Sequence, residues 1–128
     1  MREILFRGKS IKIGEWVEGW FVPGNERKSL NPSIFVYLLE TQSFDCIDVD
    51  IETVGQFIGL TDKNDQMIFE GDVIKSKNEL YCVKWFVDGL NAAYYPFVTF
   101  DDGFCVYSED CEIIGNIYDS PELKEKCR

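Results

Sequence analysis

The chain has 128 residues, of which 45% are apolar and 15% aromatic, and it contains no histidine. Its 13 basic and 23 acidic side chains give a formal net charge of −10. This composition is typical of a globular protein and excludes a disordered chain, a collagen and a membrane span. The length predicts one domain. The pattern of strands suggests two sub-regions within it, a β-sheet part at residues 1–60 and a barrel-like part at residues 61–123.

The charge is unevenly distributed along the chain. Residues 1–30 carry six basic and four acidic side chains, and the remainder carries seven and nineteen. An acidic surface repels phosphates, so nucleic acid is an unfavourable partner for the surface as a whole. The N-terminal residues include a charge every few positions and no apolar run of signal-peptide length, so we expect a cytoplasmic protein that does not associate with membranes.

Five cysteines are present, an odd number whose spacings fit neither a disulfide framework nor a zinc knuckle. We therefore expect free thiols in a reducing compartment. They are Cys46, Cys82, Cys105, Cys111 and Cys127.

Short runs of strand-like alternation predict a mainly β protein, built of several short coiled antiparallel sheets. The first strands are expected at residues 2–8 and 15–22, with a turn around Gly14 between them. In the second strand the alternation places Trp16, Glu18 and Trp20 on one face. Residues 23–32 contain two prolines and read as an exposed loop.

Two further strands are expected before the middle of the chain. The apolar run 33–39 predicts a strand covered on both faces, with one or two buried helical turns as the alternative. Residues 44–51 alternate, which places Ile47, Val49 and Ile51 toward the core and Cys46, Asp48 and Asp50 on the other face. Residues 54–60 continue the sheet, with bends at Gly55 and Gly59.

The second half reads as a turn at 61–66 followed by strands. The Gly71–Lys75 step and the Val83-Lys84-Trp85 strand are typical of an SH3-like barrel. Asp102-Gly103 predicts a hairpin between its flanking strands. A short C-terminal helix is expected after Ser120, which would cap it, with Pro121 at its first position. The strands are expected at 67–75, 79–86, 94–100, 104–107 and 112–118.

No complete catalytic or cofactor motif is present, so we expect no enzyme and no cofactor. The lack of histidine excludes Ser-His and Cys-His catalysis. The carboxylate pairs Asp48/Asp50 and Asp101/Asp102 are expected to be solvated. The loop that begins at Asp62 fails as a calcium loop, because Met67 and Val73 stand where glycine and glutamate are required.

Five blocks of sequence follow one another along the chain: Met1–Lys9, Gly14–Gly19, Thr53–Asn64, Ile68–Ile74 and Ile113–Leu123. Together they resemble the YopX-like proteins of bacteriophages and prophages, mostly of Gram-positive hosts. The resemblance implies a mostly β protein of coiled sheets with a phage-related role, and it implies no reaction. One position departs from the pattern: Asp65 stands where glycine usually follows Asp-Lys-Asn, so we expect a different turn type or a strained one.

The leading hypothesis is a non-enzymatic module that binds a host or phage protein through exposed strand aromatics, with a homo-oligomer left open. The candidate partner-binding residues are Trp16, Trp20, Asp48, Asp50, Trp85, Tyr94 and Tyr95.

Two alternatives remain. One is a nucleic-acid-associated small-barrel module, whose basic residues would contact the backbone. The other is an acidic DNA mimic that inhibits a host protein. The basic residues of the first are Arg2, Arg7, Lys9, Lys12, Arg27 and Lys28, and the acidic residues of the second are Asp45, Asp48, Asp50 and Glu52.

Overall fold

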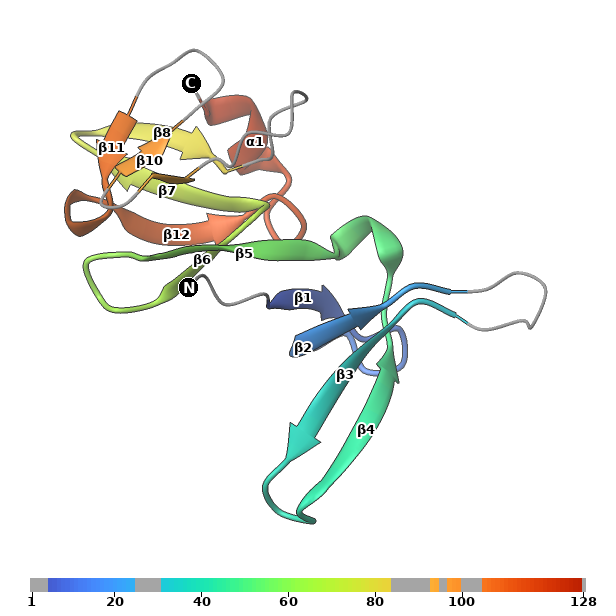
Figure 1. Ribbon diagram of the computed structural model, residues 1–128. Coiled ribbons are helices and arrows are strands. Elements are labelled where there is room, and N and C mark those ends of the chain that lie inside the picture. The colour runs from blue at the N-terminus through green and yellow to red at the C-terminus, as the bar shows by residue number, and fades with distance from the viewer. Residues whose placement is uncertain (1–4, 25–30, 84–92, 95–96, 100–104, 128) are drawn as a thin grey trace. The chain divides into compact units, whose positions relative to one another are not determined.

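The computed structural model describes residues 5–24, 31–83, 93–94, 97–99 and 105–127, with the backbone alone at 93–94, 97–99 and 105–108. It is mainly β, as predicted, with one short C-terminal α-helix (Figure 1). The strands are β1 (Phe6–Lys9), β2 (Trp16–Val22), β3 (Ser33–Leu38), β4 (Ser43–Asp48), β5 (Gly55–Thr61), β6 (Met67–Phe69), β7 (Asp72–Ser76), β8 (Glu79–Cys82), β9 (Ala93–Tyr94), β10 (Phe97–Thr99), β11 (Cys105–Tyr107) and β12 (Glu112–Asn116). The helices are the 3-10 turns η2 (Ile51–Thr53) and η3 (Ser108–Asp110) and the α-helix α1 (Glu122–Lys126).

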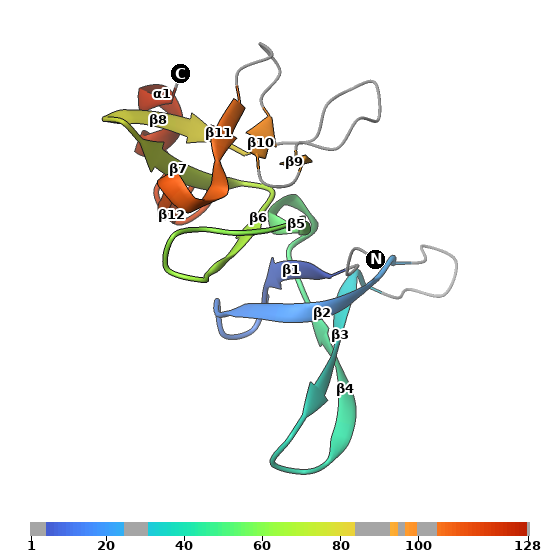
Figure 2. The ribbon, with the colours of Figure 1, turned by 60° about the vertical axis from the view of Figure 1, so that its left-hand side comes forward.

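The chain divides into two compact units, Met1–Gln56 and Phe57–Arg128. In the first unit β4, β3, β2 and β1 pair antiparallel in that order, and Gly55 and Gln56 at the start of β5 pair with β1. The turn between β1 and β2 ends at Gly14, whose φ of +70° matches the predicted turn. Figure 2 shows the β3–β4 hairpin of this sheet in a second view.

One face of this sheet forms the core of the first unit. Ile34 and Val49 are fully buried, and the rings of Phe6 and Phe21 lie 5.7 Å apart on the same face. Gly19 is required where β2 approaches β3, because a Cβ there would collide with the backbone carbonyl of Phe35. The burial of Val49 confirms the predicted core position.

The acidic strand is shorter than predicted. β4 ends at Asp48, Val49 forms an isolated bridge with Ser10, and the chain then enters η2. Ile51 is therefore not on the core face but 54% exposed. Asp50 is the N-cap of η2, where its carboxylate accepts the backbone N–H of Glu52, and this local bond explains why the alternation stops.

The prediction that residues 33–39 are covered on both faces is wrong. β3 is a strand, but only its first two residues are buried, and Leu39 at the tip of the β3–β4 hairpin is 81% exposed. A continuous apolar run shows that both faces of a strand are apolar, but it does not show whether other residues cover them.

β5 links the two units, since Phe57 and Thr61 pair with β6 after Gln56 has paired with β1. The hydrogen-bonded strand order is therefore β4-β3-β2-β1-β5-β6. The register shifts between Phe57 and Thr61, and Gly59 there has a φ of +93°, as expected for a bend.

The second unit contains an antiparallel sheet in the order β12-β7-β8. Lys77 and Asn78, between β7 and β8, both have positive φ, as a two-residue hairpin turn requires. The buried cluster beside these strands contains Ile58, Leu60, Ile68, Ile74, Tyr81, Val83 and Cys111.

A third sheet has the order β11-β10-β9. β10 and β11 pair antiparallel, which confirms the predicted hairpin, while Asp102-Gly103 itself lies outside the described residues. The described strands of the second unit do not close into a barrel, so the SH3-like barrel is not confirmed.

The predicted C-terminal helix is present as α1. Its N-cap is Pro121, the helix begins at Glu122, and no side chain caps it, so the predicted cap at Ser120 and the predicted first helical position of Pro121 are both wrong. The backbone carbonyl of Ser120 instead accepts the N–H of Leu123.

Candidate functional site

Four aromatic rings form a row on the exposed face of the first unit, which we call the aromatic row: Trp20 on β2, Phe35 and Tyr37 on β3, and Phe44 on β4. The strand register places them together, because Trp20 lies opposite Phe35 and Tyr37 lies opposite Phe44. Figure 1 shows the three strands that carry the row, with the β3–β4 hairpin extending beyond β2.

The rings contact one another along the whole row. Trp20 and Phe35 are 6.0 Å apart between centroids, Phe35 and Phe44 stack at 4.8 Å with planes 3° apart, and Phe44 meets Tyr37 edge-on at 5.0 Å. Each ring therefore restricts its neighbour before any ligand binds. Nevertheless Trp20 is 55%, Phe44 54% and Tyr37 48% exposed.

Two cations cover Trp16 on this same face. The Arg7 guanidinium carbon lies 4.6 Å from the Trp16 ring centroid, and Lys9 Nζ lies 5.8 Å from it. Register explains the arrangement, because Lys9 lies opposite Trp16 and Arg7 lies opposite Glu18. The face thus already holds cations against an aromatic ring.

Carboxylates outnumber cations in the described part of the first unit. Glu18 and Asp48 share the face of the aromatic row by strand parity, as do Arg7 and Lys9, whereas Asp45 lies on the opposite face of β4 and Glu40 lies in the hairpin turn. Residues 5–24 and 31–56 carry three cations, Arg7, Lys9 and Lys12, and seven carboxylates, Glu15, Glu18, Glu40, Asp45, Asp48, Asp50 and Glu52.

The outer edge of β4 is partly closed to another strand. The N–H of Val49 bonds Pro32 on the β3 side, so by alternation the backbone groups of Cys46 and Asp48 point outward. The Asp45 carboxylate accepts the outward N–H of Cys46 at 2.9 Å, and the outward carbonyl of Asp48 accepts the N–H of Ile11. Such local bonds protect an edge from strand addition.

The predicted site residues are only partly brought together. Trp16 and Trp20 share the aromatic face, as predicted. Asp48 accepts the side-chain amide of Asn31 at 3.3 Å, while Asp50 caps η2, so the two do not share a strand face. Trp85 and Tyr95 lie outside the described residues, and Tyr94 is described by its backbone in β9 alone.

The residues of the two alternative hypotheses, the nucleic-acid-associated module and the DNA mimic, are also only partly brought together. Arg7, Lys9 and Lys12 belong to the first unit, and Arg2, Arg27 and Lys28 lie outside the described residues. The acids of the proposed DNA mimic do not form one face, since Asp45 and Asp48 differ in parity on β4 and Glu52 lies in η2.

Sequence reasoning missed Phe35, Tyr37 and Phe44. Phe35 and Tyr37 are two residues apart and so share a strand face, and a four-residue turn at 39–42 would have placed Phe44 opposite Tyr37. This signal was hidden because the run 33–39 was interpreted as covered on both faces.

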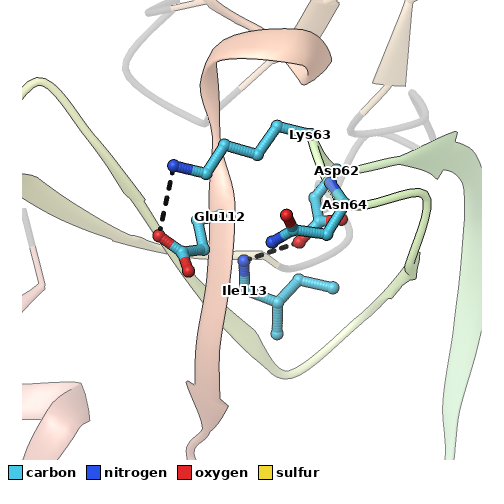
Figure 3. Close-up of polar contacts among 5 residues, drawn as sticks. All are labelled: Asp62, Lys63, Asn64, Glu112 and Ile113. Atoms are coloured by element: carbon cyan, nitrogen blue, oxygen red, sulfur yellow. Dashed lines mark hydrogen bonds and ion pairs between the residues drawn. The ribbon is translucent and has the colours of Figure 1, made fainter.

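A polar cluster in the second unit has a structural role (Figure 3). The buried carboxylate of Asp62 accepts three backbone N–H groups, those of Asn64 at 2.9 Å, Gln66 at 3.0 Å and Ile113 at 3.0 Å. Nearby, Lys63 Nζ and Glu112 Oε2 form a half-exposed ion pair at 3.3 Å. The turn also contains Asp65 at a φ of +62°, a left-handed conformation that is strained for a residue other than glycine, so the predicted strain at this position is present.

Other side chains of the sequence motifs in the second unit also form hydrogen bonds with backbone N–H groups. The carboxylate of Asp72, which is buried, accepts the N–H of Phe69, and Asn116 Oδ1 accepts those of Tyr118 and Asp119. Gly71, at a φ of +95°, lies under the Tyr118 ring, where a Cβ would come within 2.6 Å of ring carbon Cε2. These groups fix turns and strand ends.

One further hollow, with a volume of about 590 Å³, lies in the first unit beside the β1–β2 turn. The hollow is wide, and its lining is apolar at Val49, Ile51 and Pro32 and charged at Lys9 and Asp50. Within the part of the chain that the structure describes, no group of three His, Cys, Asp or Glu side chains is placed to hold a metal ion. Burial, with smaller contributions from the charges of Asp62 and Asp110, raises the pKa of the Cys111 thiol to about 11, so this thiol is protonated at neutral pH.

Together these features define a mainly β protein in which the carboxylates of the sequence motifs accept backbone N–H groups at turns and strand ends. Its aromatic row is exposed to solvent. The family model described as YopX protein matches residues 5–125, and the chain belongs to the YopX family. No curated protein matches the chain. Among the described residues, no helix has the length and apolar character needed to cross a membrane.

Proposed function

We propose that this protein is a non-enzymatic binding module that docks a protein partner on the aromatic row. The observation that carries the proposal is the exposure of Trp20, Tyr37 and Phe44, each close to half exposed, in one contiguous row. Aromatic side chains dominate the energetics of protein interfaces, and a contiguous exposed apolar patch is a typical interaction site.

The charges favour a protein over a nucleic acid. A phosphate backbone needs cations along its path, whereas the cations placed on this face, Arg7 and Lys9, are both held over Trp16 at one side of the row. Following the resemblance to phage and prophage proteins, we place the partner among host or phage proteins in the bacterial cytoplasm. The proposal assigns no reaction to the chain.

Capture from a bacterial host lysate by immobilised protein tests the proposal when two matched variants accompany it. Phe44→Ser removes a ring of the row, and Ile51→Ser removes an equally exposed apolar side chain in η2. We expect the same proteins to bind the wild type and Ile51→Ser and to be lost with Phe44→Ser. Capture that Phe44→Ser leaves unchanged, with all three proteins folded by circular dichroism, would overturn the proposal.

A further inference from the structure

The exposed rings of the aromatic row belong to a unit that carries more carboxylates than cations, and this combination points to the chemistry of the partner. We infer that the row binds an extended, arginine-bearing segment of a protein, an inference that rests on the proposed function. The guanidinium groups would lie on the exposed rings while carboxylates on the same face neutralise them.

The first support is that the face already accommodates cations in this way. Arg7 lies 4.6 Å from the Trp16 centroid, and Trp20 is the next side chain but one on the same face of β2. Arginine suits the site better than lysine because its planar guanidinium stacks on a ring and also forms paired bonds to a carboxylate.

The second support is the distribution of charge. Glu18 and Asp48 lie on the row's own face, where Arg7 and Lys9 are held over Trp16, and Glu40 is exposed in the turn at the hairpin end of the row. Over residues 1–56 the sequence holds nine acidic and six basic side chains, so the first unit as a whole carries the surplus of carboxylates. A cationic partner is attracted to such a surface.

The same charges argue against a second copy of the chain as the occupant. Two copies joined face to face would bring together two units that each carry more carboxylates than cations, at a net charge of −10 per chain. The partner is also expected to lie across the face rather than extend the sheet. Asp45 and Ile11 already occupy outward hydrogen-bonding groups at the edge of β4.

The inference is tested by titrating the full-length protein, labelled with nitrogen-15, with a short peptide of alternating serine and arginine. A peptide of alternating serine and glutamate and a short oligothymidine are the controls. We expect the arginine peptide to bind with shifts of the Trp20 indole and of β3 and β4 amides, and neither control to match it.

Variants then distinguish this site from general charge attraction. Phe44→Leu keeps an apolar side chain but removes the ring, and it should weaken arginine-peptide binding by about threefold to tenfold. Glu18→Gln should weaken it and reduce its salt dependence, whereas Ile51→Ser should have no effect. The inference would be overturned if Phe44→Leu bound the arginine peptide as tightly as the wild type does. It would also be overturned if the protein bound oligothymidine more tightly than the arginine peptide, or if the protein formed a dimer that Phe44→Leu converts to monomers.

The proposed function and this inference can fail separately. If Phe44→Ser abolishes capture of a host protein but excess arginine peptide does not compete for that protein, the row binds a partner of different chemistry and the inference is wrong. If capture is unaffected by Phe44→Ser, the proposed function is wrong as well.

Discussion

The carboxylate of Asp62 accepts the backbone N–H of Ile113 at 3.0 Å, joining two segments that lie 51 residues apart. The same carboxylate closes its own turn through Asn64 and Gln66. One buried side chain therefore orders the 62–66 turn and attaches it to β12 at once.

Replacing Asp62 by alanine should lower the free energy of unfolding by about 2–4 kcal/mol, because three backbone N–H groups lose their acceptor. Urea denaturation monitored by fluorescence measures the change. Lys63→Ala provides the neighbouring control, because it breaks a half-exposed ion pair with Glu112 and should cost less than about 1 kcal/mol. Equal losses in the free energy of unfolding for the two variants would show that the hydrogen bonds of Asp62 stabilise the protein no more than the half-exposed ion pair does.

Asp65→Gly should leave stability unchanged or raise it by up to about 1 kcal/mol. Asp65 has a φ of +62°, which glycine adopts without steric cost. Asp65→Val should destabilise by about 1–2 kcal/mol, because a β-branched residue is disfavoured there. Thermal unfolding of both variants gives the comparison, and a Val variant as stable as the Gly variant would contradict the reported turn geometry.

Gly71→Ala should destabilise the protein by more than about 2 kcal/mol. Its φ is +95°, and the added Cβ would meet the Tyr118 ring. Tyr118→Leu in the same background removes the ring but leaves the backbone strain, so it should recover only part of the loss. Complete recovery in denaturant titrations would show that the conformation of Gly71 costs nothing.

Val49→Asp should destabilise by about 3 kcal/mol or more, since it places a carboxylate at a position that is 1% exposed. Asp48→Asn and Asp50→Asn should each change stability by only about 0.5 kcal/mol, because asparagine keeps an oxygen acceptor for the Asn31 amide and for the η2 cap. Calorimetry of the three variants tests this. Tolerance of Val49→Asp would mean that the register beside β4 is wrong.

The stabilising effect of Cys111 should decrease as pH rises from about 9 to about 11. Burial raises the folded-state pKa of the thiol from 9.0 to about 11, so in this interval the folded protein keeps a proton that the unfolded chain has lost. Unfolding then releases a proton, and stability falls with rising pH. The difference in urea midpoint between wild type and Cys111→Ala should shrink over this interval, and a constant difference would contradict the shift.

Local pattern was sufficient to predict much of the first unit. The shared face of Trp16, Glu18 and Trp20, the turn at Gly14 and the burial of Val49 follow from two-residue periodicity and turn chemistry, which neighbouring residues determine by themselves. The resemblance to the YopX family rests on blocks of sequence instead, and the family model matches residues 5–125.

The tertiary structure decided what the sequence pattern left ambiguous. Apolar periodicity does not say whether anything covers a face, so the exposure of Tyr37 became evident only from the sheet itself. The stacking of Phe35 on Phe44 depends on the register between β3 and β4. The bond from Ile113 to Asp62 depends on a pairing of distant segments, which no local signal encodes, because the free energy that selects it comes from burying both segments together.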